Sequence, residues 1–403
     1  MSEKIVVIGN GIGSITAIKA IRKENPQVEI HLIGEERFYP YNRIRLSKGL
    51  LSTLEEDKLL LQKREWYETN NINLHKGVKA ISIDEKNNRV LLSDETSLEY
   101  TKLLIGSGAH NFKPPIDGIE KEGVYTLRTL DDAWGIMDKV KDSNVILNIG
   151  GGIQGLETAY ILSQSNKKVI LVEINERLMP KQLDMKASEI LKDTVESSGV
   201  NILLNTGVNE ILGENRVEGV SSDKYDHVAC DMVIYSTGIK PNISMTKDTN
   251  IKTNRGIIVD DKMRTSIENI YAAGDVAEYK GHVYGLWNIA IEQGKTAGHN
   301  MVCEGENYKE VVPVTTLNAF GIGLFSMGTI EEADYVIVEE PEENKYEKIF
   351  IKDNRVIGAI VVGDVKKSPA LKKAIEKEIN LEEVDFENVS INELIGIIKN
   401  KNI

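Results

Sequence analysis

The stretch that decides the fold lies near the start of the chain, where residues 5–14 read IVVIGNGIGS. The first four residues form a short apolar run of the kind found in a buried parallel strand. A glycine-rich turn follows, and apolar residues then recur at helical spacing, at Ile15, Ile18 and Ile21. The segment therefore predicts a strand, a tight turn and a helix, and residues 29–33 predict the second strand of the same unit.

The same pattern occurs a second time at residues 145–155, which read VILNIGGGIQG. A helix is predicted next, through Ala159 and Leu162, and residues 169–172 predict the following strand. One chain thus carries two strand–turn–helix–strand units. We expect an α/β fold with two Rossmann-like dinucleotide-binding domains.

Each position of the first glycine turn has a physical role. Gly9 permits the tight turn, and Gly11 lets a pyrophosphate approach the backbone at the N-terminus of the helix. The third position needs a small side chain so that helix and strand pack closely, and Ser14 is small enough. Glu35, just past the second strand, can accept hydrogen bonds from ribose hydroxyl groups, with Glu36 as the alternative. The competing interpretation is an ordinary βα turn.

The second glycine turn fits the dinucleotide pattern more closely, with Gly150, Gly152 and Gly155 at the required spacing. Glu173 ends the following strand. A carboxylate at that place favours an unmodified ribose 2′-hydroxyl, and hence NADH over NADPH. Arg177 and Lys181 follow shortly afterwards, so the preference for NADH need not be strict.

Length and composition narrow the class of protein. The 403 residues suffice for two or three domains, and 41% apolar with 28% charged residues is ordinary for a globular enzyme. A formal net charge of −13 argues against nonspecific binding to nucleic acid or anionic membranes. No apolar run is long enough to span a membrane, and the N-terminus has no signal-peptide pattern. Two cysteines, Cys230 and Cys303, make no disulfide framework, which suits the cytoplasm.

The last part of the chain has a different character. Short strands are predicted at residues 335–338, 348–351 and 356–362, separated by turns, and helices follow from Pro369. We expect a third domain of α+β type over residues 313–403.

Five motifs in this order resemble those of the FAD/NAD(P)-dependent pyridine nucleotide-disulfide oxidoreductase superfamily. They are the glycine turn at Gly9, the Gly-Ser-Gly strand end at 106–108, the glycine turn at Gly150, the TGIKPN stretch at 237–242 and the YAAGD stretch at 271–275. The resemblance implies a glutathione-reductase-like arrangement, in which an NAD-binding domain (114–242) is inserted into an FAD-binding domain (1–113 and 243–312). It also implies FAD and NADH as cofactors.

A narrower resemblance points to the NADH:rubredoxin oxidoreductase group and to the FAD/NAD half of the assimilatory nitrite reductase large subunit. It rests on residues 39–47 (YPYNRIRLS), 178–184 (LMPKQLD) and 284–287 (YGLW), and on the C-terminal segments at 320–322 and 326–328. Ser14 and Ser107 depart from the usual residues of the superfamily, and Gln154 stands where an apolar residue is common. None of these departures removes a charged contact.

The resemblance implies roles for individual residues. Lys48 and Glu157 match positions that form an ion pair beside the flavin, where a cation stabilises the reduced ring and a carboxylate orients that cation. A solvated loop lysine and a helix-N-terminal acid are the competing interpretations. Further cofactor-binding residues are expected toward FAD and toward NAD. Toward FAD they are Gly9, Gly11, Ser14, Glu35, Arg43, Ser107, Gly108, Arg128, Asp275, Leu286 and Trp287; toward NAD they are Gly150, Gly152, Gly155, Glu173 and Gly238.

Missing residues exclude other chemistry. Related disulfide reductases carry a cysteine pair near the start of the first domain, and related peroxidases carry one cysteine there, but residues 39–52 contain none. The sequence therefore predicts no thiol relay. No cysteine cluster exists for an iron–sulfur centre, and the six histidines show no metal-ligand spacing, so no metal site is expected.

The implied activity is hydride transfer from NADH to FAD, followed by single-electron transfer to a small carrier protein, rubredoxin before ferredoxin. Two alternatives stay open: an NADH oxidase that reduces oxygen, and a flavin electron-donor subunit of a larger reductase complex. An acidic carrier could dock on residues 37–64, which hold seven basic and three acidic residues, or on residues 366–377, which hold five lysines and one glutamate. A solvated face is the competing interpretation for each segment. The sequence leaves the oligomeric state open.

Overall fold

The computed structural model describes residues 3–303 and 305–401, and these divide into two compact units. Unit 1 comprises residues 1–45, 54–112 and 238–311. Unit 2 comprises residues 46–53, 113–237 and 312–403. The short segment 46–53 thus groups with unit 2, although both of its flanks belong to unit 1.

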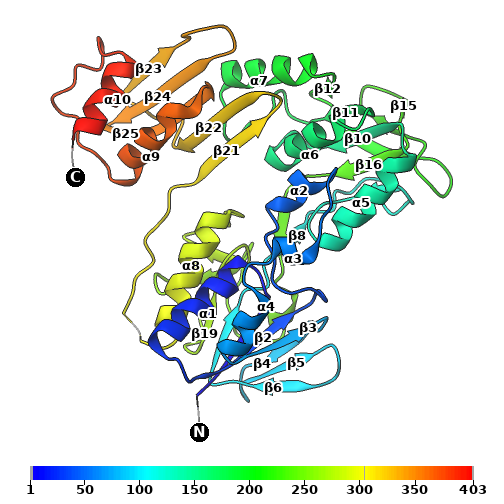
Figure 1. The fold of residues 1–403 in the computed structure, drawn as a ribbon, viewed down its shortest axis with the longest axis vertical. Coiled ribbons are helices and arrows are strands. Elements are labelled where there is room, and N and C mark those ends of the chain that lie inside the picture. Colours follow the sequence, from blue (N-terminus) through cyan, green and yellow to red (C-terminus); the bar gives the residue numbers. More distant parts are fainter. Residues whose placement is uncertain (1–2, 304, 402–403) are drawn as a thin grey trace. The chain divides into compact units, whose positions relative to one another are not determined.

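Unit 1 is built on a five-stranded parallel sheet of order β19-β7-β1-β2-β3 (Figure 1). Its strands are β1 (Lys4–Ile8), β2 (Glu29–Gly34), β3 (Ile72–Lys76), β7 (Lys102–Ile105) and β19 (Ile270–Ala272). The register places Ile5 opposite Ile30 on one side and Lys102 on the other. Because β1 is central, the apolar run that opens the chain lies in the middle of the sheet.

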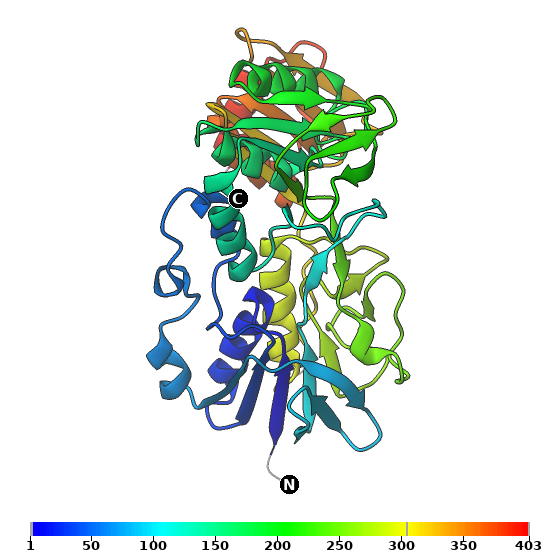
Figure 2. The ribbon, with the colours of Figure 1, turned by 90° about the vertical axis from the view of Figure 1, so that its right-hand side faces the viewer.

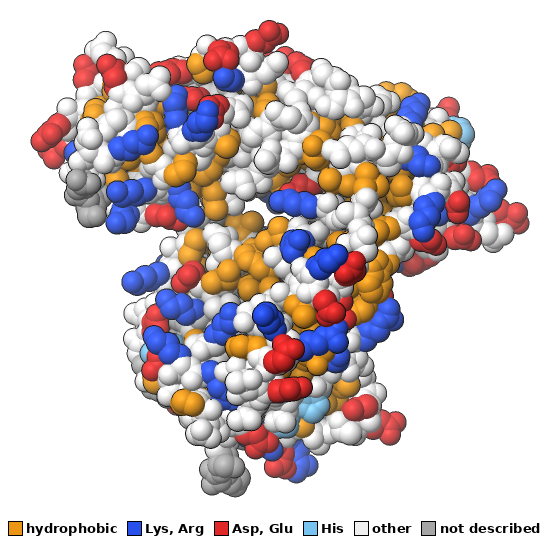
Figure 3. Space-filling model, viewed as in Figure 1, with side chains coloured by type: hydrophobic (Ala, Val, Ile, Leu, Met, Phe, Trp, Pro, Cys, Tyr) orange, Lys and Arg blue, Asp and Glu red, His pale blue; other side chains and the backbone are white. Residues whose placement is uncertain are grey.

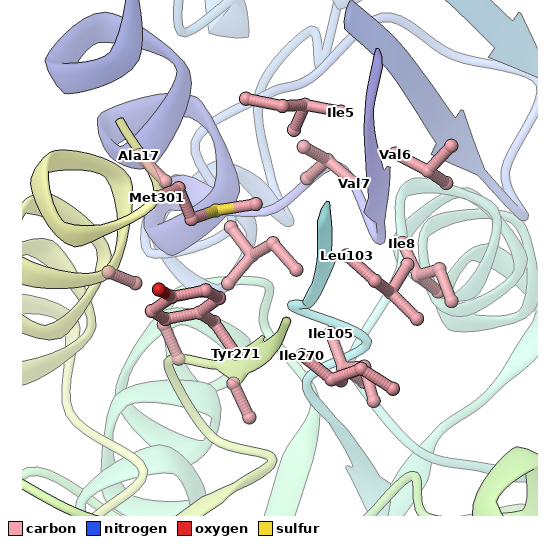
Figure 4. Packing of buried hydrophobic residues seen from close by; sticks show 14 of the residues in the cluster. Ile5, Val6, Val7, Ile8, Ala17, Leu103, Ile105, Ile270, Tyr271 and Met301 are labelled. Carbon is pink, nitrogen blue, oxygen red and sulfur yellow. The ribbon is translucent and has the colours of Figure 1, made fainter. Parts of the chain in front are cut away.

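The core of unit 1 explains why that run is so apolar. Ile5, Val6 and Val7 are fully buried, and Figure 4 shows them packing with side chains from β7 and β19. Met301 and Tyr271 are buried in the same cluster. The Tyr271 hydroxyl donates to the carbonyl of Asn300 at 3.1 Å. Strands buried on both faces need continuous rather than alternating apolar residues, which is the pattern of β1.

Two helices of unit 1, α1 (Ile12–Glu24) and α8 (Trp287–Asn300), pack side by side (Figures 1 and 2). A Cβ atom on Gly294 would lie 2.1 Å from the carbonyl oxygen of Gly13, and one on Gly298 would lie 2.3 Å from that of Ala17. The residue numbers increase together along the contact, from Gly13 to Ala17 on α1 and from Gly294 to Gly298 on α8, so the two helices run parallel. Their N-termini therefore lie at the same end of the sheet.

Gly294→Ala should lower the stability of the protein by about 1–3 kcal/mol, because the added methyl group meets rigid backbone of α1. Gly396→Ala is the matched control, since α10 (Ile391–Asn400) leaves open space beside that glycine. The control should gain roughly 0.5–1 kcal/mol from the higher helix propensity of alanine. Thermal unfolding of both variants is the measurement, and a stabilised Gly294→Ala would show that the two helices do not pack this closely.

Smaller elements complete unit 1. Its additional sheets are β4-β5-β6, β8-β17 and β18-β20. Their strands are β4 (Ala80–Asp84), β5 (Arg89–Leu92), β6 (Ser97–Glu99), β8 (Ala109–Asn111), β17 (Ile239–Pro241), β18 (Ile257–Val259) and β20 (Ala277–Tyr279). Short helices are α3 (Glu56–Leu59), α4 (Arg64–Thr69) and the 3₁₀ turn η1 (Ser244–Thr246), while α2 (Arg45–Gly49) begins at the border of the two units.

Unit 2 contains a second five-stranded parallel sheet, of order β12-β11-β10-β16-β9. Its strands are β9 (Val124–Tyr125), β10 (Val145–Ile149), β11 (Lys168–Val172), β12 (Asn201–Leu203) and β16 (Met232–Tyr235). Helices α5 (Leu130–Asp142), α6 (Ile153–Ser163) and α7 (Met185–Ser197) accompany it, with the antiparallel strands β13 (Val208–Leu212), β14 (Gly219–Ser222) and β15 (Val228–Ala229). The two glycine turns thus connect the central strand of each parallel sheet to its helix.

The C-terminal part of unit 2 is an antiparallel sheet of order β21-β22-β25-β24-β23. Its strands are β21 (Val314–Ala319), β22 (Ile322–Gly328), β23 (Tyr335–Glu339), β24 (Tyr346–Lys352) and β25 (Arg355–Gly363). The 3₁₀ turn η2 (Val365–Lys367), α9 (Ser368–Glu376) and α10 follow, and the two helices bury apolar residues against one face of the sheet. Within residues 3–303 and 305–401, no helix combines the length and apolar character that crossing a bilayer requires.

Candidate functional site

The first glycine turn of unit 1 is shaped as its sequence predicts. Gly9 has φ +90°, and a Cβ atom there would lie 2.1 Å from the carbonyl oxygen of Gly106. Gly11 is the N-cap of α1, receives no side-chain cap, and has nothing within 4 Å of the position of a Cβ atom. The first turn of α1 also holds no acidic residue. The N-terminus of α1 therefore has no side-chain cap and open space beside Gly11, which together suit an anion.

Ser14 lies where helix and strand approach most closely. It is only 1% exposed, and its Oγ would lie 2.2 Å from a Cβ atom on Gly106. In the part of the chain that the structure describes, neither Ser14 Oγ nor the buried Nδ2 of Asn10 has a hydrogen-bond partner. Buried polar atoms without partners are uncommon and call for an explanation. A polar ligand held in this turn would supply one.

A second helix N-terminus lies at the same end of the sheet as that of α1. Leu286 is the N-cap of α8 and Trp287 its first residue, and both are partly buried. Asp275 follows Gly274, whose φ is +81° and whose N–H donates to Gln293 Oε1 at 2.9 Å. The turn before Asp275 thus rests on α8. The sequence alone assigns no role to Gln293.

Arg43 lies in a charged network within unit 1. Its Nη2 contacts Glu36 Oε1 at 2.5 Å, and its Nη1 donates to the Tyr41 hydroxyl at 3.2 Å. Burial lowers the pKa of Arg43, but Tyr41, Glu36 and Asp275 together raise it above the ordinary arginine value. The guanidinium is therefore a permanent positive charge that interacts with Asp275.

The two carboxylates proposed for ribose differ in their surroundings. Glu35 is exposed and pairs with Lys79 at 2.8 Å. Glu36 is partly buried and accepts from the Tyr41 hydroxyl at 2.6 Å as well as from Arg43. Glu35 is thus the more accessible carboxylate at the end of β2, and its role toward ribose stays a prediction.

The strand end after β7 is held by a residue that the sequence interpretation left without a role. Asn242 Nδ2 donates to the carbonyl of Ser107, and Ser107 Oγ donates to the carbonyl of Asn242, each at 2.9 Å. Gly108 and Gly238 precede the paired strands β8 and β17 with φ of +65° and +104°. Gly238 has nothing within 4 Å of the position of a Cβ atom, and it groups with unit 1.

The glycine turn of unit 2 repeats the geometry of the first. Gly150 has φ +113°, and a Cβ atom there would lie 2.5 Å from the carbonyl oxygen of Ser236. Gly152 is the N-cap of α6, again with no side-chain cap and nothing within 4 Å of a Cβ position. A Cβ atom on Gly155 would lie 1.9 Å from the carbonyl oxygen of Gly150, so only glycine permits this approach of helix to strand.

Glu173 is tied to this turn. Its side chain is buried, with the residue only 6% exposed. Oε2 accepts from the N–H of Gly151 at 2.6 Å, and Oε1 accepts from the N–H of Asn175 at 2.8 Å. The carboxylate keeps further lone pairs for ribose hydroxyl groups. Its second task, holding the glycine turn in shape, could not be inferred from the sequence.

The ion pair expected between Lys48 and Glu157 is absent from the described residues, and Glu157 has a different partner. Glu157, on α6, accepts from Ser47 Oγ at 2.8 Å. Lys48 is exposed, and within residues 3–303 and 305–401 it has no carboxylate within 4.0 Å. Arg128 is partly buried and its N–H donates to Asp132 Oδ2 at 2.9 Å, just before the capping box of α5. Ser47 was missed because its hydroxyl carries no charge signal.

The helix caps distinguish two groups of helices. Among described helices of eight or more residues, α5, α7 and α10 have side-chain N-caps, from Thr129, Asp184 and Ser390. Helices α1, α6, α8 and α9 have none. Helix α9 begins with Pro369 in its first turn, whereas α1 and α6 begin directly at the two glycine turns. Two open glycine N-caps and the unpartnered Ser14 hydroxyl therefore fit two dinucleotide pyrophosphates, one in each unit.

The cysteines lie apart from both turns in the chain and differ in environment. Cys230 is buried, and this burial raises its pKa to about 12. Cys303 is exposed, and partial desolvation together with Glu24 raises its pKa. Thiols with raised pKa values are poor nucleophiles at neutral pH.

The two basic segments are partly neutralised. Arg64 pairs with Asp57 at 2.6 Å, and Arg43 is held by Glu36. On the C-terminal segment Lys367 pairs with Glu347 at 2.6 Å, and the strongly exposed Lys366 pairs with Asp364 at 3.0 Å. Figure 3 shows Lys and Arg side chains over the α9 region with acidic side chains among them. Docking of a partner at either segment stays a prediction.

Two family models match the chain. One, described as pyridine nucleotide-disulphide oxidoreductase, matches residues 3–294. The other, described as the rubredoxin NAD+ reductase C-terminal domain, matches residues 313–379. Together they cover both parallel sheets and most of the C-terminal sheet and helices.

Relatives along the whole chain are also found. The chain is 34% identical over 396 residues to an NADH-rubredoxin oxidoreductase of Clostridium acetobutylicum, covering 98% of this chain and 100% of the relative. It is 33% identical to a nitrite reductase of Bacillus subtilis, covering 94% of this chain but 48% of that protein. A crystal structure of NADH:rubredoxin oxidoreductase from C. acetobutylicum matches with a TM-score of 0.81 at 32% identity, over 98% of this chain and 100% of that one.

Proposed function

Because the chain belongs to the pyridine nucleotide-disulphide oxidoreductase family, we propose that it passes electrons from NADH, through bound FAD, to a small one-electron carrier protein. Rubredoxin is the first candidate for the carrier and ferredoxin the second. The observation that carries the proposal is the pair of helices that begin at a glycine N-cap, one in each unit, with no side-chain cap and open space beside the glycine. We also propose a cytoplasmic location, which rests on the cysteine content.

The residues of unit 1 are proposed to hold FAD. The N-termini of α1 and α8 place backbone N–H groups at one end of the sheet, where they can bind the pyrophosphate. Arg43 adds a permanent positive charge, and Asp275 and Glu35 offer carboxylate oxygens to hydroxyl groups. Bound FAD supplies the ability to accept a hydride from NADH and to give up electrons one at a time.

The residues of unit 2 are proposed to bind and orient NADH. The N-terminus of α6 receives the pyrophosphate, and Glu173 receives the ribose hydroxyl groups. Glu157, oriented by the Ser47 hydroxyl, and Lys48 are the proposed charged residues near the reacting rings. Hydride transfer requires alignment of the two rings rather than a proton-donating side chain, so the task of these residues is to hold position.

The Glu173→Ala variant should raise the KM for NADH by about tenfold, because it removes about one hydrogen bond to a charged group, worth roughly 1.5 kcal/mol. Glu173→Gln is the informative partner, because glutamine can still accept from the Gly151 N–H but carries no charge. Glu173→Gln should narrow the preference for NADH over NADPH while changing the NADH KM less than Glu173→Ala does. Steady-state kinetics with both nucleotides decide the point, and an unchanged NADH/NADPH ratio in both variants would contradict the role of Glu173.

The proposed activity is tested by anaerobic NADH oxidation by the flavin-loaded protein, with rubredoxin as the sole electron acceptor. Fast turnover that falls as the salt concentration rises would support a carrier docked through basic residues. Flavin reduction without rubredoxin turnover would redirect the proposal to ferredoxin. Turnover only with oxygen would favour an NADH oxidase, and turnover with none of these acceptors would favour a subunit of a larger reductase complex.

A further inference from the structure

The segment 178–184 connects the nucleotide-binding turn of unit 2 to the C-terminal sheet. It begins shortly after Glu173 and ends at the N-cap of α7 (Figure 1). All the parts concerned lie in unit 2. One end of the segment contacts the glycine turn, and the other end is hydrogen-bonded to the C-terminal sheet. The segment therefore links that sheet to the turn.

At its first end the segment holds the peptide group of Gly151. The N–H of Met179 donates to the carbonyl of Gly151 at 3.1 Å. A Cβ atom on Gly151 would lie 2.7 Å from Leu178 Cδ2, so the buried Leu178 side chain lies directly against this glycine. The N–H of Gly151 donates to Glu173 Oε2 at 2.6 Å. The turn that presents N–H groups to the nucleotide is therefore clamped from two sides.

Inside the segment the backbone is under strain. Met179 is buried and has φ +48°, a conformation that costs free energy for a residue with a Cβ atom. Its carbonyl accepts from the N–H groups of Gln182 and Leu183 at 2.9 and 3.0 Å. Such a conformation persists only where the surroundings hold it in place. The far end of the segment provides part of that hold.

At its far end the segment is bound by the C-terminal sheet. Ser326 Oγ donates to the carbonyl of Gln182 at 2.6 Å. The carboxylate of Asp184 accepts from the Tyr346 hydroxyl and from Lys348 Nζ, each at 2.8 Å. Burial raises the pKa of Asp184, but Lys348, the N–H of Ala187 and Tyr346 outweigh this and hold the pKa below its usual range. Asp184 is thus a charged anchor point at neutral pH.

A second contact links the same two parts. Tyr160, on α6, packs edge-on against Phe320, with ring centroids 5.0 Å apart. Phe320 lies in the turn between β21 and β22, and α6 is the helix whose N-terminus follows Gly152. The C-terminal sheet therefore contacts both the glycine-capped helix and the segment beside the glycine turn.

We propose that the C-terminal domain fixes the shape of the nucleotide-binding turn through Asp184, and that Tyr346 and Lys348 are positioning residues for NADH. This inference rests on the proposed function, since it assigns NADH to the turn at residues 150–152. Arg177 is a parallel restraint, because it donates to the carbonyls of Pro180 and Leu183 at 3.2 and 3.3 Å from within the nucleotide domain. Loss of the anchor should therefore loosen the turn without unfolding it.

The test compares Lys348→Met and Asp184→Asn with wild type, all as full-length, flavin-loaded protein. Methionine keeps most of the lysine chain, and asparagine still caps α7, so both variants are chosen to fold. Lys352→Met is the matched control, because Lys352 is on the same strand but lies near Glu332 at 3.9 Å instead of Asp184. Lys348→Arg is the conservative rescue. NAD⁺ affinity is measured by titration calorimetry, and flavin reduction by stopped-flow against NADH concentration.

Lys348→Met and Asp184→Asn are expected to weaken NAD⁺ binding by about 5–10-fold. The flavin content and the limiting rate of flavin reduction should stay within about twofold of wild type, and Lys348→Arg and Lys352→Met should bind NAD⁺ as wild type does. The double variant should be no weaker than either single one, since both break the same contact.

Wild-type affinity in both Lys348→Met and Asp184→Asn would overturn the inference while leaving the proposed function in place. Losses of affinity that are matched by losses of flavin and of melting temperature would also overturn it, because the domain would then only stabilise the fold. A wild-type protein that neither binds NAD⁺ nor is reduced by NADH would overturn the proposed function itself, and the inference with it.

Discussion

The Gly152→Asp variant is expected to keep its flavin and to bind NADH at least about 100-fold more weakly than wild type. Gly152 is the N-cap of α6, with φ −80° and open space at the position of its Cβ, so an aspartate fits there without strain. Aspartate is a preferred N-cap, and its carboxylate would accept from the first N–H groups of the helix. These are the groups that would otherwise bind the pyrophosphate, and the new charge also repels it.

The melting temperature of Gly152→Asp distinguishes a specific loss of NADH binding from a general loss of folded structure. A side-chain cap in place of glycine should leave the melting temperature unchanged or slightly higher, a gain of a few tenths of a kcal/mol. A loss of about 100-fold corresponds to about 2.7 kcal/mol of binding free energy. Gly152→Ser is the control, because serine caps the helix without a charge and should weaken binding less. NADH affinity close to wild type in Gly152→Asp would place the pyrophosphate elsewhere.

The Gly11→Asp variant is expected to purify with less than about one tenth of the wild-type flavin content, because its affinity for FAD falls below what holds the cofactor through purification. Gly11 occupies the same place on α1 that Gly152 occupies on α6, with φ −74° and open space beside it. An aspartate there would cap α1 and compete with the pyrophosphate of FAD for the same N–H groups.

The measurement for Gly11→Asp is the ratio of visible flavin absorbance to protein absorbance after purification and after incubation with excess FAD. Gly152→Asp serves as the control for purification losses, because its flavin should stay bound. Each variant should therefore lose a different ligand: Gly11→Asp should lose FAD, and Gly152→Asp should lose NADH. A yellow Gly11→Asp protein and a colourless Gly152→Asp protein would reverse the assignment of FAD to unit 1 and NADH to unit 2.

The fold could be predicted from the sequence because its signals are local. The apolar run at residues 5–8 and the glycines at 9 and 11 act on their immediate neighbours, and the structure has β1 and α1 where they predict them. The strands predicted in the C-terminal region are present as well, with β24 beginning two residues earlier than expected. Backbone conformation at a glycine and burial of a strand need only a short stretch of chain to be recognised.

The candidate site was predictable only where backbone geometry defines it. The glycine turns lie as the sequence predicts, whereas the partners of the charged side chains do not follow from it. Glu157 contacts Ser47, which is 110 residues away in the chain, and Glu173 is turned into its own glycine turn. Short polar side chains such as Ser47 and Asn242 give no periodic signal, so their roles appear only when distant segments meet.

The sequence by itself determined that this protein has two strand–turn–helix units with open, glycine-capped helices, because steric limits on φ and the need for close backbone approach act within a few residues. Only the tertiary structure decided which side chains hold those turns in shape. The segment 46–53 joins unit 2, and Asp184 is bound by Tyr346 and Lys348 from the C-terminal sheet. Such contacts depend on the packing of segments more than 100 residues apart, and no local pattern in the chain encodes them.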